Sequence, residues 1–151
     1  MKFTAQSLLS GFVLLIVSAC SGEKPLIPLM TCSISKKLDE CSATPTLEKG
    51  KLKILPGEKF TLDAQYQACF HQEAVVIQGK YKGASFNNGL TIELLATKIK
   101  GLKSSEFPTT IAVVTLEKSV LKGVINDVWA SIRSSTQSDG KHVAEITCKK
   151  D

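Results

Sequence analysis

The sequence is poor in the side chains that carry most enzyme chemistry and phosphate recognition. Its 151 residues include two histidines, one tryptophan and a single arginine, Arg133, so that lysine supplies nearly all of the basic charge. Arginine is the residue that binds phosphate and carboxylate groups in a bidentate way, whereas scattered lysines are typical of solvated faces. No run of five or six like charges occurs. We therefore expect no nucleic acid partner.

Motifs for catalysis and metal binding are also missing. The chain has no G-x-S-x-G, no H-E-x-x-H, no Walker-type glycine loop and no C-x-x-C pair. His71 and Glu73 would share one face of a strand, where an acid and a base or two metal ligands could meet, but the P-C-x-x-C of a zinc deaminase is absent. The carboxylates Asp63, Glu93 and Asp127 cannot be placed in one cleft from the sequence. We expect no enzyme activity, catalytic residue, metal or cofactor.

The apolar run near the N-terminus is too short to span a bilayer. It extends from Leu8 to Val17, about ten residues, whereas a transmembrane helix needs roughly 20. Lys2 precedes the run, and the small residues Ser18 and Ala19 follow it. A basic start, a short apolar core and a small-residue cleavage site predict a secretory signal peptide over residues 1–19.

The ending Val17-Ser18-Ala19-Cys20 resembles the lipobox of bacterial lipoproteins, and this resemblance covers residues 1–20 only. It implies that a diacylglyceryl group is attached to Cys20, that the chain is cleaved before this residue and that the new N-terminus is acylated. Ser21 is not the aspartate that retains Gram-negative lipoproteins in the inner membrane, which implies an outer-membrane anchor facing the periplasm. Two or three acyl chains hold a protein stably without a transmembrane helix.

The remaining chain is long enough for one domain with a real core. In residues 20–31, Pro25 and Pro28 restrict the backbone to extended conformations, so we expect a lipidated tether there. Residues 32–151 would form a single disulfide-containing, β-rich domain.

Cysteine use follows from the predicted compartment. With Cys20 acylated, four cysteines remain in an oxidising space, which predicts two disulfides. Four cysteines allow three pairings, and the sequence does not choose among them. Of these we favour Cys32 with Cys41, which are close in sequence, and Cys69 with Cys148, which would connect the last strand to the middle of the fold.

Alternating apolar residues separated by turn residues predict a mainly β fold. From Phe60 to Tyr66 every second residue is apolar, directly after the turn-forming segment 56–58, Pro-Gly-Glu. Asn-Asn-Gly at 87–89 marks another turn, and Asp139-Gly140 predicts a hairpin between strands at 128–136 and 142–148. We expect an antiparallel β-sandwich or barrel-like domain of about six to seven strands.

One segment favours a helix as an alternative. Its apolar residues follow the i, i+1, i+4, i+5 spacing of an amphipathic helix, and Ser119 could cap it: Val120, Leu121, Val124, Ile125, Val128, Trp129 and Ile132. Gly123 and the many β-branched residues oppose a helix. We favour a strand for residues 128–136; a helix near 119–133 would make the class α+β.

Small size, an anchor, disulfides and no catalytic set together predict a non-catalytic interaction module. Such a protein would bind another envelope protein as an assembly factor, an inhibitor or an immunity protein, by edge-strand pairing or loop insertion. Aromatic side chains are the usual anchors of such contacts, and the candidates are Tyr66, Tyr81, Phe86, Phe107 and Trp129.

A structural envelope lipoprotein is the alternative. Three pairs of lysines two residues apart would each face one side of a strand and could form a positive patch for anionic lipid or lipopolysaccharide: Lys51 and Lys53, Lys80 and Lys82, Lys98 and Lys100.

Overall fold

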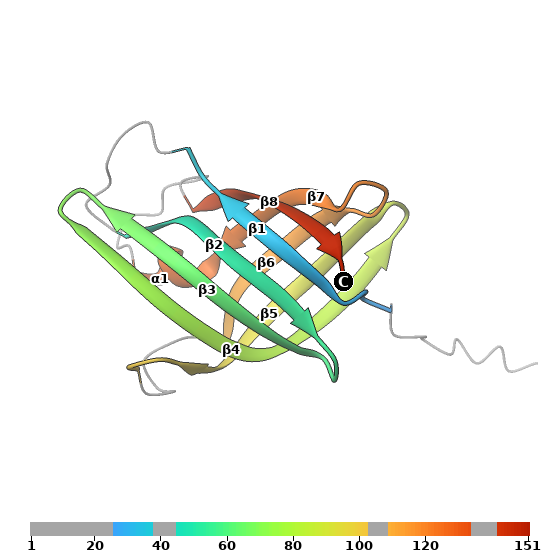
Figure 1. Cartoon of the computed structure of the whole chain (residues 1–151), viewed down its shortest axis with the longest axis horizontal. Coiled ribbons are helices and arrows are strands. Elements are labelled where there is room, and N and C mark those ends of the chain that lie inside the picture. Colours follow the sequence, from blue (N-terminus) through green and yellow to red (C-terminus); the bar gives the residue numbers. More distant parts are fainter. Residues whose placement is uncertain (1–25, 38–44, 103–108, 134–141) are drawn as a thin grey trace, which may run out of the picture.

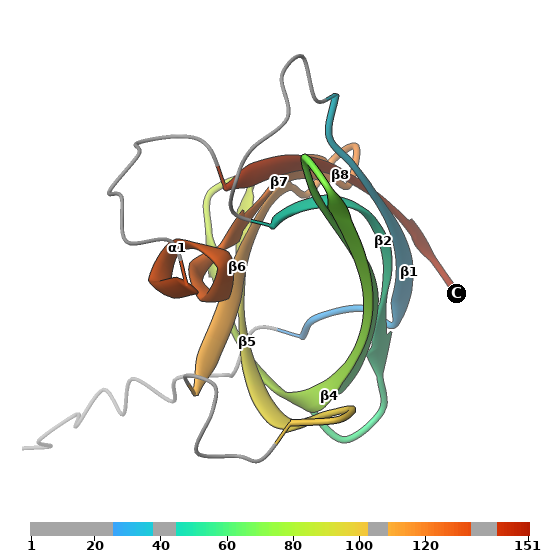
Figure 2. The same cartoon turned by 90° about the vertical axis from the view of Figure 1, so that its left-hand side faces the viewer.

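The computed structural model describes residues 26–37, 45–102, 109–133 and 142–151, in which eight antiparallel strands close into a barrel (Figures 1 and 2). A six-residue helix, α1, lies beside the barrel wall. The elements are β1 (Met30–Ser35), β2 (Thr46–Leu55), β3 (Lys59–Ala68), β4 (His71–Phe86), β5 (Gly89–Ile99), β6 (Thr110–Glu117), β7 (Lys122–Asp127), α1 (Val128–Arg133) and β8 (Val143–Lys150).

Each strand pairs with the next along the chain, and β8 pairs with β1. The mainly β, barrel-like prediction is confirmed, with eight strands in the described part of the chain instead of six to seven. The additional strands are β1, part of which we had assigned to the tether, and β7, which overlaps the segment with helical spacing. Each described strand has a hydrogen-bonded neighbour on both sides, so no whole strand lies at an edge, which disfavours the expected edge-strand pairing with a partner.

Period-two alternation builds the core as the sequence predicts. Inward-facing residues of β2 to β5, such as Leu52, Phe60, Ile77 and Ile92, are almost completely buried. An eight-stranded barrel has an interior just wide enough for side chains to fill, and these residues belong to one continuous apolar core. The turn before β3 contains Gly57, whose φ of 76° explains the choice of glycine there.

The barrel begins earlier than the predicted domain boundary at residue 32. β1 starts at Met30, and both Met30 and Ile27 are buried in the core. The predicted tether, 20–31, must therefore be shortened, because its last residues are part of the fold.

The favoured disulfide pairing is wrong. Cys32 is bonded to Cys148, because β1 and β8 close the barrel with these two residues directly opposite each other. The amide of Cys148 donates to the carbonyl of Leu121 on the β7 side (2.8 Å), so the two cysteines form a non-hydrogen-bonded pair, in which the Cα atoms approach most closely, here to 3.9 Å. Cys69 is also disulfide-bonded, and its partner is not among the described residues; Cys41 lies outside them.

The strand favoured for 128–136 is also wrong, because residues 128–133 form α1. Asp127 ends β7 and caps the helix: its Oδ1 accepts a hydrogen bond from the amide of Ala130 (2.8 Å). Gly123 lies in β7, where an added Cβ would be 1.8 Å from the carbonyl oxygen of Thr115, so only glycine allows this approach of β7 to β6. The predicted turn at Asp139-Gly140 lies outside the described residues.

The two ends of the barrel differ. The helix end contains α1, Lys36 and the β3–β4 turn at Cys69 and Phe70, and it faces the viewer in Figure 2. The terminal end contains Leu26, where the described chain enters, the C-terminal Asp151, and the β2–β3, β4–β5 and β6–β7 turns, at the right of Figure 1.

Candidate functional site

A buried carboxylate lies at the helix end. Asp127 is only 1% exposed, and its amide donates to the carbonyl oxygen of His142 (2.9 Å), which is buried beside it. The half-buried Lys36 lies close enough to interact electrostatically with Asp127, and its amide donates to the carbonyl oxygen of Glu48 (2.7 Å). Lys36, Asp127 and His142 come from three separate segments, and they are the ionisable residues that sequence reasoning failed to bring together.

Burial lowers the pKa of Lys36 below its ordinary value, and the Asp127 carboxylate opposes this shift. A lysine with a lowered pKa beside a carboxylate is a combination that enzymes use for proton transfer. Here, however, Asp127 is engaged as the cap of α1, and neither of the two described depressions of the surface is lined by any of the three residues. The capping hydrogen bond gives Asp127 a structural function, which is to fix the start of α1 at the end of β7.

Aromatic packing closes the same end. Trp129 of α1 meets Tyr66 of β3 edge-to-face, with ring centroids 5.7 Å apart, and both side chains are buried. Such a pair contributes about 0.5–1.5 kcal/mol beyond its buried area. Two of the aromatic residues proposed as partner contacts thus belong to the core, and Tyr81 is buried as well.

The expected aromatic contact residues are only partly available. Phe86 is 81% exposed at the end of β4, and Phe107 lies outside the described residues. Sequence reasoning missed Phe70, which is fully exposed in the two-residue turn between β3 and β4. The sequence signal for an exposed turn at Phe70 was the alternating apolar pattern on both sides of it. The neighbouring Cys69 is held by a disulfide.

His71 and Glu73 both lie at the start of β4, and Glu73 lies opposite the buried Tyr66. His71 is exposed and Glu73 is half-buried. Within the described residues, no group of three or more histidine, cysteine or carboxylate side chains could hold a metal ion. Asp63 and Glu93 face the outside of β3 and β5, away from Asp127 at the helix end, so these carboxylates share no cleft.

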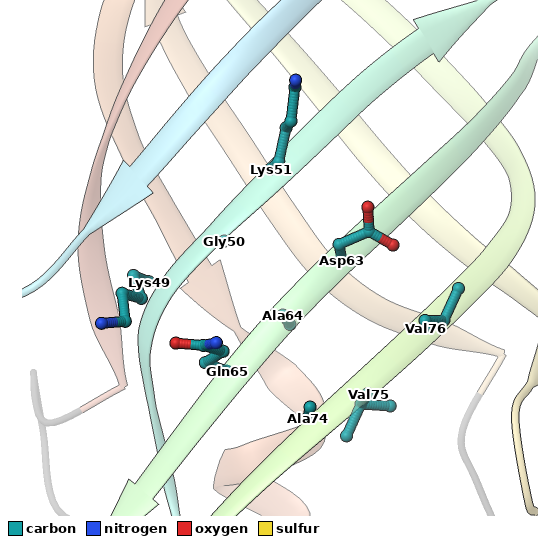
Figure 3. A pocket seen from close by; sticks show the side chains of 9 residues that line it. All are labelled: Lys49, Gly50, Lys51, Asp63, Ala64, Gln65, Ala74, Val75 and Val76. Carbon is teal, nitrogen blue, oxygen red and sulfur yellow. The ribbon is translucent and has the colours of Figure 1, made fainter.

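A shallow depression of about 440 Å³ lies on the outer wall over β2, β3 and β4 (Figure 3). Lys49 and Lys51 line one side and Val76 the other, with Asp63 and Gln65 between them. The Oε1 atom of Gln65 is buried without a hydrogen-bond partner in the described part of the chain. The depression is open to solvent, and its lining combines charged, polar and apolar side chains.

The lysines of the three predicted pairs are exposed, and two of them lie opposite carboxylates on neighbouring strands. Lys51 lies opposite Asp63 across β2 and β3, and Lys82 lies opposite Glu93 across β4 and β5. Lys100 lies one residue beyond the end of β5. The carboxylates on intervening positions reduce the positive potential of these strand faces.

The fold defines a class, an antiparallel up-and-down β-barrel closed by one disulfide-linked seam. No protein-family model, curated protein or solved structure matches the chain. Among the described helices, none is long and apolar enough to cross a membrane. Cys20, the residue at which acylation is expected, lies outside the described residues.

Proposed function

We propose that this protein is a lipid-anchored component of the bacterial cell envelope that binds another envelope protein non-catalytically, through the helix end of its barrel. The lipobox-like segment ending at Cys20 supports an outer-membrane anchor with the barrel in the periplasm. The carrying observation is that the chain enters the barrel at Leu26 on the terminal end, whereas the fully exposed Phe70 lies at the opposite end. The anchor would therefore leave Phe70 free to meet a partner.

Phe70 has the properties of an interface anchor. It is a large aromatic side chain in a short turn between two long, paired strands, so little backbone freedom is lost when it binds. Its neighbour Cys69 is disulfide-bonded, and with Cys20 acylated the cysteine left for this bond is Cys41. Such a bond would hold the turn further in place.

Two observations favour this proposal over the structural alternative. The strand-face lysines alternate with Asp63 and Glu93, which weakens attraction to anionic lipid over the wall. Closure of the barrel leaves no described strand as a whole edge strand, which favours recognition by the turns and the outer surface.

The test is a quantitative pull-down from envelope extract with the mature domain, using Phe70→Ala and the matched control Phe86→Ala. Both positions are exposed aromatics in turns or at strand ends, so neither change should affect folding. We expect wild type and Phe86→Ala to retain the same saturable partner, and Phe70→Ala to bind it at least about 30-fold more weakly, the size of a hot-spot loss. Equal binding by all three proteins, or no saturable partner at all, would contradict the proposal.

A further inference from the structure

The terminal end carries an exposed apolar rim. Four large apolar side chains from three separate segments are exposed there: Leu26, Leu29, Phe86 and Val120. Leu26 is 95% exposed. Single exposed apolar residues are ordinary on protein surfaces, but a group at one end of a barrel marks a contact surface.

Hydrogen bonds hold two of these segments together. The side-chain amide of Asn88 donates hydrogen bonds to Glu117 Oε1 (3.1 Å) and to Ser119 Oγ (3.2 Å). The backbone amide of Lys118 donates to the carbonyl oxygen of Asn88 (2.7 Å), and its Nζ donates to the carbonyl oxygen of Asn87 (3.1 Å). The β4–β5 turn is thereby fastened to the β6–β7 turn. Phe86 directly precedes the β4–β5 turn and Val120 lies in the β6–β7 turn, so both belong to turns that are bonded to each other. Figure 1 shows these two turns at the right.

A second set of bonds fixes the chain entry. The amide of Asp151 donates to the carbonyl oxygen of Leu29 (3.1 Å), and Thr31 Oγ1 donates to Asp151 Oδ1 (2.9 Å). The entering segment is thus bound to the end of β8, and the position at which the chain reaches the barrel is defined.

The charge of this end favours an anionic surface. Among the described residues, its turns and strand ends expose six lysines and three carboxylates: Lys53, Lys59, Lys118, Lys122, Lys149 and Lys150, against Glu58, Glu117 and Asp151. Lysines close to a bilayer are attracted by anionic headgroups, and this attraction falls off within a Debye length. An apolar rim surrounded by lysines is the composition of interfacial membrane contacts.

The length of the chain before Leu26 sets the distance to the anchor. Five residues lie between Cys20 and Leu26, and the six residue steps span at most about 22 Å at about 3.3–3.6 Å each. An acylated Cys20 therefore keeps the terminal end, and not the helix end, within reach of the headgroups.

We infer that the terminal end is a membrane-facing surface, in which Phe86 and Val120 enter the interface of an anionic phospholipid bilayer while the lysines contact its headgroups. This inference rests on the acylation of Cys20 in the proposed function, but not on the identity of any protein partner. It places the helix end, with Phe70, away from the bilayer.

The test uses the full acylated chain in anionic vesicles that contain phosphatidylglycerol, with and without brominated phospholipid. Phe86→Trp places a fluorophore on the rim, and Phe70→Trp is its matched control at the other end of β4. Trp129 is buried at the helix end in all variants and supplies a constant background. We expect a blue shift and a loss of emission in brominated vesicles for Phe86→Trp, and neither change for Phe70→Trp or wild type.

The outcomes separate the two proposals. No quenching in Phe86→Trp, equal quenching in both variants, or quenching confined to Phe70→Trp would overturn the membrane-facing assignment. Mass spectrometry of the same preparation reports whether Cys20 is acylated. Absence of the acyl groups would contradict the anchoring step of the proposed function, whereas the quenching result decides which end of the barrel contacts the bilayer. Failure of the Phe70→Ala pull-down would leave the bilayer contact of Phe86 unaffected.

Discussion

Phe70 and Phe86 lie at the two ends of a single strand, since Phe70 directly precedes β4 and Phe86 is its last residue. The 16 residues of β4 correspond to about 50 Å of extended chain. Both side chains are strongly exposed, Phe70 at the helix end and Phe86 at the terminal end of the barrel. In the proposed function the barrel is a spacer between two contact surfaces, and the two phenylalanines supply a matched pair of positions for experiments.

The seam disulfide should contribute strongly to stability. Replacing Cys32 and Cys148 by alanine opens a closed loop with a sequence separation of 116, which in the chain-entropy model costs about 5 kcal/mol. Urea denaturation followed by circular dichroism measures this loss. As a control, Ser33 and Thr147 are the neighbouring exposed cross-strand pair, and changing both to alanine should cost less than about 1 kcal/mol. Similar losses for the two double variants would contradict a stabilising seam.

Asp127 should stabilise α1 through its capping oxygen. Asp127→Ala removes the acceptor of the Ala130 amide and should lower the free energy of unfolding by at least about 1 kcal/mol, whereas Asp127→Asn retains a good capping group and should lose less. Hydrogen exchange of the Ala130 amide reports the cap directly. If Asp127→Ala and Asp127→Asn exchange this amide at the wild-type rate, the cap is not what holds the helix.

The charge of Asp127 should also set the titration of Lys36. Burial lowers the pKa of Lys36 and Asp127 raises it, so Asp127→Asn should lower this pKa further. The folded state binds the Lys36 proton less tightly than the unfolded state, because the pKa of Lys36 is lower in the folded protein. The free energy of unfolding should therefore rise with pH between the lowered pKa of folded Lys36 and the ordinary lysine pKa near 10.5.

Nuclear magnetic resonance of the lysine side chains follows the titration of Lys36, which is compared between wild type and Asp127→Asn. An unchanged or increased pKa of Lys36 in Asp127→Asn would show that the two groups do not interact as described.

Gly123 should tolerate no side chain. An added Cβ would be 1.8 Å from the carbonyl oxygen of Thr115, so Gly123→Ala must displace backbone and should cost at least about 2 kcal/mol. Its neighbour Val124 is exposed on the same strand, and Val124→Ala should change stability by less than about 0.5 kcal/mol. Equal melting temperatures for the two variants would rule out the close contact between β6 and β7.

Local patterns in the sequence predicted the hairpins because their causes are local. The turn at Gly57 and the alternation from Phe60 to Tyr66 depend on residues a few positions apart, and both are confirmed. The pairing of Cys32 with Cys148 could not be predicted in this way, because it follows from closure of the barrel across 116 residues. Strand order, which no local pattern encodes, decided it.

The strand favoured for residues 128–136 was wrong because a local pattern allowed two interpretations. The apolar spacing from Val120 to Trp129 suits both a strand followed by a helix and a single element, and the change at Asp127 depends on one capping hydrogen bond. The electrostatic interaction of Lys36 with Asp127 likewise requires the closed barrel, because Lys36 follows β1 and Asp127 ends β7, far away in the sequence. Phe70 escaped detection because its turn contains no glycine, proline or asparagine.

The central claim is that one end of the barrel faces the bilayer and the other faces a protein. The most direct measurement is photo-cross-linking in living cells with benzoylphenylalanine at position 70 or 86 of the full chain, followed by mass spectrometry of the adducts. We predict phospholipid adducts at position 86 and adducts of a single envelope protein at position 70. Lipid adducts at position 70, or the same adducts at both positions, would contradict the two-ended organisation.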